Sequence, residues 1–151
     1  MRRILLSLAV AGMLSAGGAA FAATADQEAA FVNTYKTAFE AKDAATLESL
    51  LFTDNAIPAA LEFYKMAMTA DMGQKITTIE LQPLDADDIK NVGQEMPDPD
   101  GNMSKLEPKP YKKLVIKIDM KDDNGTSSST STVFVAEKDG KLGVPVPVPA
   151  N

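Results

Sequence analysis

The stretch KLVIKIDMKDDNGTSSSTSTVFVAEKDGKLGVPVPVP, residues 113–149, decides the fold class. Apolar residues occupy every second position from Leu114 to Met120, which is the period of a β-strand with one buried face. Asp123-Asn124-Gly125 is a tight-turn signal, and Asp139-Gly140 is another. The spacing therefore predicts an antiparallel meander of three strands, over about 113–121, 127–137 and 142–148.

Valine alternates with proline in the last of these strands, from Val144 to Pro149. Alternate residues of an extended strand direct their N–H groups to opposite sides, so the three missing donors fall along one edge. The valines can pair inward while the prolines prevent a further strand from pairing. We expect a blocked edge strand. The alternative is an extended polyproline-type arm that packs on the surface or on a partner.

Helical periodicity extends from Asp26 to about Gly73, where we expect three amphipathic helices. Asp26 is the expected cap of the first, and Asp43 begins a short second helix. Asn55 is the expected cap of the third, which has Pro58 in its first turn and ends near Gly73. The apolar stripes of the three helices are Phe31, Tyr35, Ala38 and Phe39; Leu47, Leu50 and Leu51; and Leu61, Tyr64 and Met68.

The middle of the chain is less regular. Ile79 and Leu81 alternate with polar residues and predict one more strand. Between about 85 and 110, acids, prolines and glycine predict a loop or a poor hairpin that turns at Pro97–Asn102. The order of these elements predicts an α+β fold, with three N-terminal helices packed on a curved antiparallel sheet, in one domain over 23–151.

The N-terminus has the three parts of a secretory signal. Met1-Arg2-Arg3 is cationic, residues 4–20 are apolar, and Ala20-Phe21-Ala22 has the small-x-small pattern that signal peptidase cuts. We expect cleavage after Ala22 and a periplasmic or secreted protein. Because the signal carries two arginines and no acid, its removal makes the net charge of −6 more negative by two.

Composition excludes several classes of function. The chain has no cysteine and no histidine, which removes disulfides, cysteine or histidine catalysis, ordinary zinc sites and haem ligation. The acidic net charge disfavours nucleic acid and membrane-surface partners. No apolar run after Ala23 is long enough for a membrane anchor.

The run Ala38-Phe39-Glu40-Ala41-Lys42-Asp43, followed by Leu47, Leu50-Leu51-Phe52 and Asp54-Asn55-Ala56, resembles the opening of NTF2-like domains of the cystatin-like cone type. The resemblance covers about residues 26–60 and implies three helices lying across a bent sheet, with a conical pocket between them. Members of that superfamily include ketosteroid-isomerase-like enzymes, binders of small ligands, dimerisation modules and exported domains, so the fold alone does not give an activity.

An isomerase of this type would carry its catalytic base a few residues after Ala56, by the same resemblance. The sequence there is Pro58-Ala59-Ala60-Leu61, without an ionisable side chain. The leading hypothesis is therefore a non-enzymatic exported domain that binds a small apolar or amphipathic ligand, or a protein partner. The alternatives are an isomerase, hydratase or cyclase that uses a pocket carboxylate such as Asp54 with Tyr35, and a structural module that forms a homodimer through its sheet face.

Three tyrosines and two apolar neighbours are the candidate pocket residues. An apolar wall with a few hydroxyl groups is typical of a small-molecule site. The alternative is that the tyrosines lie at the core boundary with satisfied hydroxyls. The candidate residues are Tyr35, Tyr64, Tyr111, Phe39 and Met68.

Two patterns suggest metal ions, and neither leads us to predict one. Asp98-Pro99-Asp100-Gly101-Asn102 departs from the EF-hand template, because Met103 replaces the glycine and Lys109 the bidentate glutamate. Met66, Met68 and Met72 invite a Cu(I) hypothesis, but Met66 lies on a different helical face and core packing is the favoured interpretation. We expect no metal and no cofactor.

Overall fold

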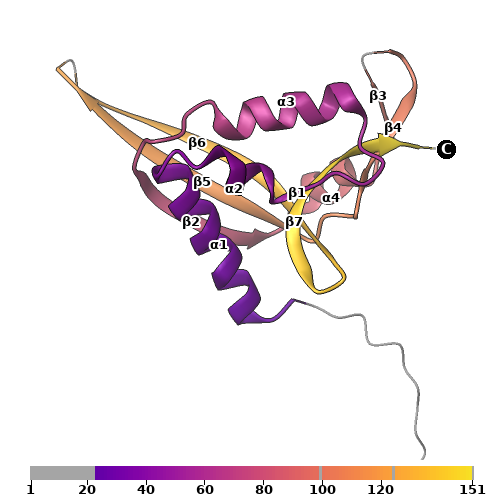
Figure 1. The fold of residues 1–151 in the computed structure, drawn as a ribbon, viewed down its shortest axis with the longest axis horizontal. Coiled ribbons are helices and arrows are strands. Elements are labelled where there is room, and N and C mark those ends of the chain that lie inside the picture. Colours follow the sequence, from indigo (N-terminus) through magenta and orange to yellow (C-terminus); the bar gives the residue numbers. More distant parts are fainter. Residues whose placement is uncertain (1–22, 99, 124, 151) are drawn as a thin grey trace, which may run out of the picture.

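The computed structural model describes residues 23–98, 100–123 and 125–150, so the predicted signal segment lies outside the described residues. The fold is α+β, as predicted, and Figure 1 shows its elements. Their order is α1 (Ala25–Glu40), α2 (Ala44–Glu48), β1 (Leu51–Phe52), α3 (Pro58–Thr69), β2 (Ile76–Pro83), α4 (Ala86–Val92), β3 (Met96–Pro97), β4 (Met103–Glu107), β5 (Lys112–Asp122), β6 (Gly125–Lys138) and β7 (Lys141–Pro149).

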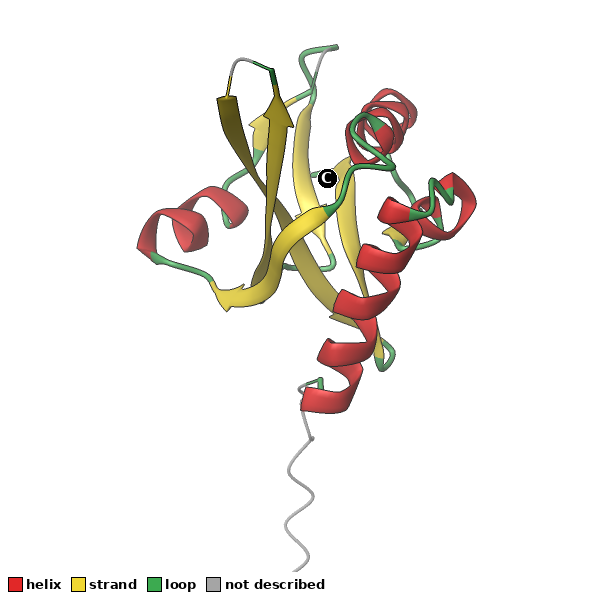
Figure 2. Ribbon diagram, turned by 90° about the vertical axis from the view of Figure 1, so that its left-hand side faces the viewer, coloured by secondary structure: helices red, strands yellow, loops and turns green. Residues whose placement is uncertain are grey.

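The strands form one curved sheet in the order β2-β5-β6-β7-β4-β3, in which neighbours are antiparallel. The short β1 pairs with β7 in parallel. The meander β5-β6-β7 confirms the prediction from residues 113–149. In Figure 2, the short helix α4 lies on the opposite side of the sheet from α1, α2 and α3.

The core lies between α1–α3 and the sheet. Tyr35 and Phe39 of α1 and Met68 of α3 are buried in it, together with apolar residues of the strands. The largest fully buried side chains are Leu47, Ile76, Leu114, Val135, Val144, Pro145 and Val146.

The first two helices begin at capping side chains. The cap of α1 is Thr24, not Asp26: the Thr24 hydroxyl accepts from the Gln27 N–H at 3.2 Å, and the Gln27 side chain accepts from the Thr24 N–H at 2.8 Å. This reciprocal pair satisfies two N–H groups, and Asp26 has no equivalent partner at its third position. Asp43 caps α2 as predicted, accepting from the Thr46 N–H at 3.0 Å.

The third helix begins without a side-chain cap. Its N-cap is Ile57 rather than Asn55, and Pro58 occupies the first turn, where no N–H donor is needed. The helix ends at Thr69, earlier than predicted. Gly73 lies in the following turn with φ +88°, a conformation that favours glycine, and donates its N–H to the Phe39 carbonyl at 2.7 Å.

The region expected to be irregular contains a fourth helix. β3 and β4 pair as a hairpin, which is one of the two alternatives expected around Pro97–Asn102, whereas α4 was not predicted. Asp85 caps it, and the Asp85 and Asp88 carboxylates accept from each other's N–H groups at 2.9 and 3.1 Å. Lys113 of β5 donates to both carboxylates and so ties α4 to the sheet. Seven residues give too few turns for an apolar period to be visible in the sequence.

The prediction of an edge strand at Val144–Pro149 is wrong, as is the alternative of a surface arm. Residues 141–143 of β7 pair with β6, and residues 146–149 pair with β4. Val144 and Val146 are fully buried. Burial decides the outcome, because a strand with so many apolar residues is more stable inside the sheet than at its border.

The proline pattern nevertheless controls the pairing. Lys138 and Lys141 close the two-residue turn between β6 and β7. The next residues of β7 whose backbone nitrogens face β6 are Gly143, which has an N–H donor, and then three prolines, which have none. Pairing with β6 stops at Gly143. On the other side, the Val144 N–H donates to the Leu50 carbonyl at 2.8 Å, and the following valines face β4. β7 therefore leaves β6 where its prolines begin.

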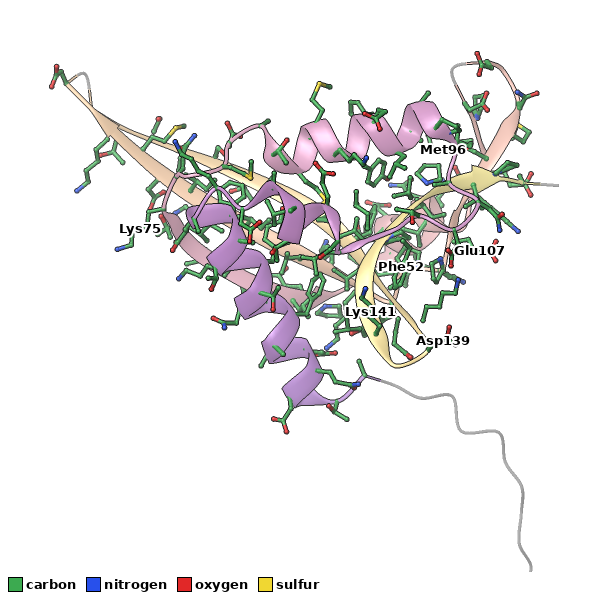
Figure 3. The ribbon with its side chains drawn as sticks, viewed as in Figure 1. Phe52, Lys75, Met96, Glu107, Asp139 and Lys141 are labelled. Carbon is green, nitrogen blue, oxygen red and sulfur yellow. The ribbon has the colours of Figure 1, made fainter. Side chains whose placement is uncertain are left out.

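The approach of β1 to β7 requires a glycine at position 143. A Cβ atom there would lie 2.7 Å from the Leu50 carbonyl oxygen and 2.8 Å from the Phe52 ring. Figure 3 shows Phe52 close to β7, with Asp139 and Lys141 at the turn that joins β6 and β7. Gly143 thus allows β7 to contact β1 at the point where it separates from β6.

Candidate functional site

The separation of β6 and β7 leaves a cavity under α3. Its volume is about 360 Å³, and its walls come from α1, α3 and the three strands of the meander. The volume is within the range of small-molecule sites. The lining residues are Tyr35, Phe39, Phe63, Tyr64, Ala67, Met68, Asp71, Ile118, Ser131, Thr132, Val133, Phe134 and Val144.

The strand β6 presents its edge to this cavity. Four consecutive residues, 131–134, line it. Successive side chains of a strand point to opposite faces, so a cavity that contacts all four borders the edge of the strand, where backbone N–H and C=O groups lie. The cavity therefore combines apolar side chains with backbone hydrogen-bonding groups.

Tyr35 is the most deeply buried polar residue in the wall. It is 2% exposed, and its ring stacks on Phe39 with centroids 6.3 Å apart and planes 14° from parallel. Burial raises the pKa of its hydroxyl to about 12. No hydrogen bond among the described residues involves this hydroxyl. Every polar side-chain atom of these residues that is fully enclosed by protein has a hydrogen-bond partner, so the Tyr35 oxygen is not fully enclosed. We conclude that the hydroxyl oxygen reaches the cavity.

The helix α3 supplies the opposite wall. Met68 is buried, and burial also raises the pKa of the Tyr64 hydroxyl. Phe63 packs edge-on against Tyr64, with centroids 6.3 Å apart and planes at 74°, and is itself 59% exposed at the mouth. The wall is thus apolar inside and continues onto an exposed apolar surface.

The structure brings together four of the five candidate residues and leaves out Tyr111. The Tyr111 hydroxyl donates to Glu28 at 3.1 Å, and the same carboxylate group pairs with Lys112 at 2.7 Å. Burial and the hydrogen bond to Glu28 raise the pKa of Tyr111. Tyr111 therefore links β5 to the first turn of α1, and its hydroxyl is satisfied there.

The residues that the sequence did not single out are those of the strands, above all Phe134 and Val144. Their apolar character was visible, but nothing local indicates where two neighbouring strands separate. Phe134 and Tyr64 also line an adjoining cavity of about 210 Å³, which continues between β6 and β4 to Leu106 and Pro147. The separation of β6 from β7 thus opens both spaces.

The carboxylate required by an enzyme mechanism lies elsewhere. Asp54 accepts from the Lys138 ammonium at 2.7 Å, and this contact holds the pKa of Asp54 below its ordinary value. It lines a different cleft from Tyr35. The acid at the cavity is Asp71, which is exposed. The structure does not bring Asp54 and Tyr35 together.

The cleft that contains Asp54 is larger, about 1060 Å³, and is charged. Its walls carry Lys105, Lys109 and Lys138, and also Glu107, which pairs with Lys105 at 3.1 Å. Figure 3 labels Phe52 and Glu107 on this side of the molecule. Most of the charged side chains in this cleft pair with one another, which leaves few of them for a ligand. We therefore regard the cavity under α3 as the stronger candidate site.

The two patterns examined for metal ions have local explanations. The Asp98 carboxylate accepts from the N–H groups of Asp100 and Asn102, at 2.9 and 2.8 Å, and so forms the hairpin turn. Met66 is 62% exposed, whereas Met68 is 5% exposed and belongs to the core. Within the ranges that the structure describes, no three acidic side chains lie close enough to hold a metal ion.

In the described part of the chain, no helix combines the length and the apolar character that are needed to cross a bilayer. The chain matches no family model, no curated protein and no solved structure.

Proposed function

We propose that the protein is a non-enzymatic exported domain that binds a small apolar or amphipathic ligand in the cavity under α3. The ligand's apolar part lies against Phe39, Tyr64 and Met68. A polar group of the ligand accepts a hydrogen bond from the Tyr35 hydroxyl.

The observation that carries this proposal is the Tyr35 hydroxyl. A ligand that covers a hydroxyl without accepting its hydrogen bond leaves that hydroxyl unsatisfied, which costs about 1–3 kcal/mol. Here the oxygen has no protein partner in the described residues and reaches an apolar cavity. A ligand with one polar atom satisfies it and covers the apolar wall at the same time.

Two broader features fit the proposal. Helices that lie over a curved sheet, with a cavity between the layers, support an NTF2-like cone, the type that residues 38–56 resemble. The features of residues 1–22 support export. The enzyme alternative gains no support from Asp54, which is paired with Lys138 and lies in another cleft.

Titration with Nile red, a neutral apolar dye, tests the site. Ala67 lines the cavity, and the indole of Ala67→Trp should occupy part of it. The dye then loses the apolar contacts that it would make in that volume, so its binding should weaken at least about 10-fold. Ala59→Trp is the matched control, because Ala59 is an exposed residue of the same helix outside the cavity. Equal binding by the two variants would contradict the proposal.

Native mass spectrometry of the protein purified from its own host tests the natural ligand. We expect a bound molecule of small mass that is lost in Ala67→Trp. Tyr35→Phe should retain dye binding and should weaken binding of a ligand with a hydrogen-bond acceptor by roughly threefold to tenfold. An unchanged affinity of such a ligand would remove Tyr35 from the site.

A further inference from the structure

We propose that β6 pairs through its free edge with β6 of a second copy of this chain. The two strands run antiparallel about a two-fold axis, so that the sheets of the two copies become one. This interface uses the edge of β6 mainly outside the cavity and does not require that the cavity binds a ligand, although Thr132 also lines the cavity.

The edge is free because β7 leaves it. β5 pairs with residues 125–135 of β6 on one side, whereas β7 pairs with residues 136–138 on the other. Even-numbered residues face β7, as Ala136 and Lys138 do. The N–H and C=O groups of Thr126, Ser128, Thr130 and Thr132 therefore point away from β5, and none of them has a backbone partner among the described residues.

The same edge lacks the features that usually prevent strand addition. No charged residue and no proline occurs from Gly125 to Ala136, and residues 125–132 are all exposed. The other two borders of the sheet differ: β2 carries Glu80 and ends in Pro83, and β3 has only two residues, one of them Pro97. Charges, prolines and short length keep edges from pairing, so β6 is the border open to a partner.

The self-compatible side chains of the edge favour a second copy of the chain as that partner. The net charge of −6 opposes association of two identical chains, so a contact between copies requires a surface without acidic side chains. The edge of β6 carries no charge, and its hydroxyl side chains are compatible with themselves across a two-fold axis. The β5–β6 hairpin also projects beyond the helices at its turn, which leaves this edge accessible (Figure 1).

An exposed apolar surface continues from the same edge. Phe63 and Ala67 line the cavity together with residues 131–134 of β6. On α3, Phe63 and Met66 are 59% and 62% exposed. A second copy on the edge of β6 lies next to this surface and shields part of it from water. One occupant thus accounts for both the open edge and the exposed apolar residues.

Sedimentation equilibrium of the full chain and of Thr130→Pro tests the interface. The Thr130 N–H faces the free edge, so proline removes a donor of the dimer without removing a bond to β5. We expect the dissociation constant of the dimer to rise by about 10-fold to 100-fold, because two copies each lose a hydrogen bond and gain a clash. Thr130→Val keeps the N–H and should dimerise as the parent does.

A charge variant and cysteine scanning provide independent readouts. Ser128→Lys places like charges on the paired edges of both copies and should weaken the dimer, whereas Thr78→Lys on β2 should not. The chain contains no cysteine, so a disulfide in a variant with a single cysteine at one of positions 126–132 must join two copies at that position. Oxidation should cross-link copies most efficiently at the residue nearest the axis.

A strict monomer at high concentration would overturn the proposal. So would a dimer that persists in both Thr130→Pro and Ser128→Lys, because it would use another surface. Circular dichroism of each variant shows whether the fold is retained. Failure of dye binding leaves this proposal intact, since sedimentation equilibrium measures association of two chains and requires no ligand, although Thr132 belongs to both the edge and the cavity wall.

Discussion

The strands β6 and β7 follow each other through a two-residue turn and end in opposite environments. The first eight residues of β6 are exposed, and five consecutive residues of β7, from Leu142 to Val146, are buried. β6 has hydroxyl side chains and an open edge, whereas β7 has prolines and partners on both sides. The comparison shows that the prolines, which remove donors from one edge of β7, also leave the facing edge of β6 unpaired.

The largest expected effect is that of a charge in β7. Val146 is fully buried, so Val146→Asp should lower the free energy of unfolding by at least about 4 kcal/mol, or prevent folding, because an unpaired carboxylate would lie in the core. Denaturant unfolding measures it. The same charge in β6, Ser129→Asp, should cost less than about 1 kcal/mol. Similar losses in both strands would refute the contrast between them.

Tyr35, which lines the cavity between the strands, should make the free energy of unfolding depend on pH. Burial raises the pKa of Tyr35 from 10.0 to about 12. The folded state binds this proton more tightly, so stability should fall as the pH rises above 10, by about 2–3 kcal/mol once it exceeds 12. Unfolding followed at several alkaline pH values checks this. Tyr35→Phe should lose that part of the pH dependence. An equal slope in both proteins would show that Tyr35 ionises without penalty.

Position 143, where β7 separates from β6, should tolerate no side chain. Gly143→Ala places a methyl group 2.7 Å from the Leu50 carbonyl oxygen, so we expect a loss of about 1–3 kcal/mol in the free energy of unfolding. Thermal unfolding of the variant and of Lys141→Ala, an exposed position in the same strand, measures the difference. A neutral Gly143→Ala would mean that β1 and β7 adjust easily.

The smallest effect should come from returning one donor to β7. Pro145→Ala restores an N–H that faces β6, opposite Phe134, and allows the pairing to extend by one step. We expect slower hydrogen exchange at Phe134, with a change in stability of about 1 kcal/mol or less. Pro149→Ala, at the exposed end of β7, is the control. Unchanged exchange at Phe134 would show that features other than the proline end the pairing.

Local sequence signals predicted the elements and much of the cavity wall. The strict alternation from Leu114 to Met120 identified β5, and the two glycine-containing turns identified the meander. Tyr35, Phe39, Tyr64 and Met68, the candidates for an apolar wall with hydroxyl groups, lie on predicted helices, and the structure brings them to one cavity. The strand predictions are confirmed because periodicity is a property of neighbouring residues.

The errors concern features that depend on residues far apart in the chain. Tyr111 was expected at the pocket, but Glu28 of α1 binds its hydroxyl. Asp54 was a possible partner of Tyr35, yet Lys138 of β6 holds it in another cleft. α4 was missed because its stability comes from Asp85 and Asp88, which cap it and bind Lys113.

The alternation of valine and proline from Val144 to Pro149 determined by itself which edge of that strand can donate hydrogen bonds, since that depends only on local backbone geometry. The tertiary structure alone decided which strands accept those bonds and whether the strand lies inside or at the border. Burial of the valines between the helices and the sheet made that choice, and the separation of β7 from β6 then created both the cavity and the open edge.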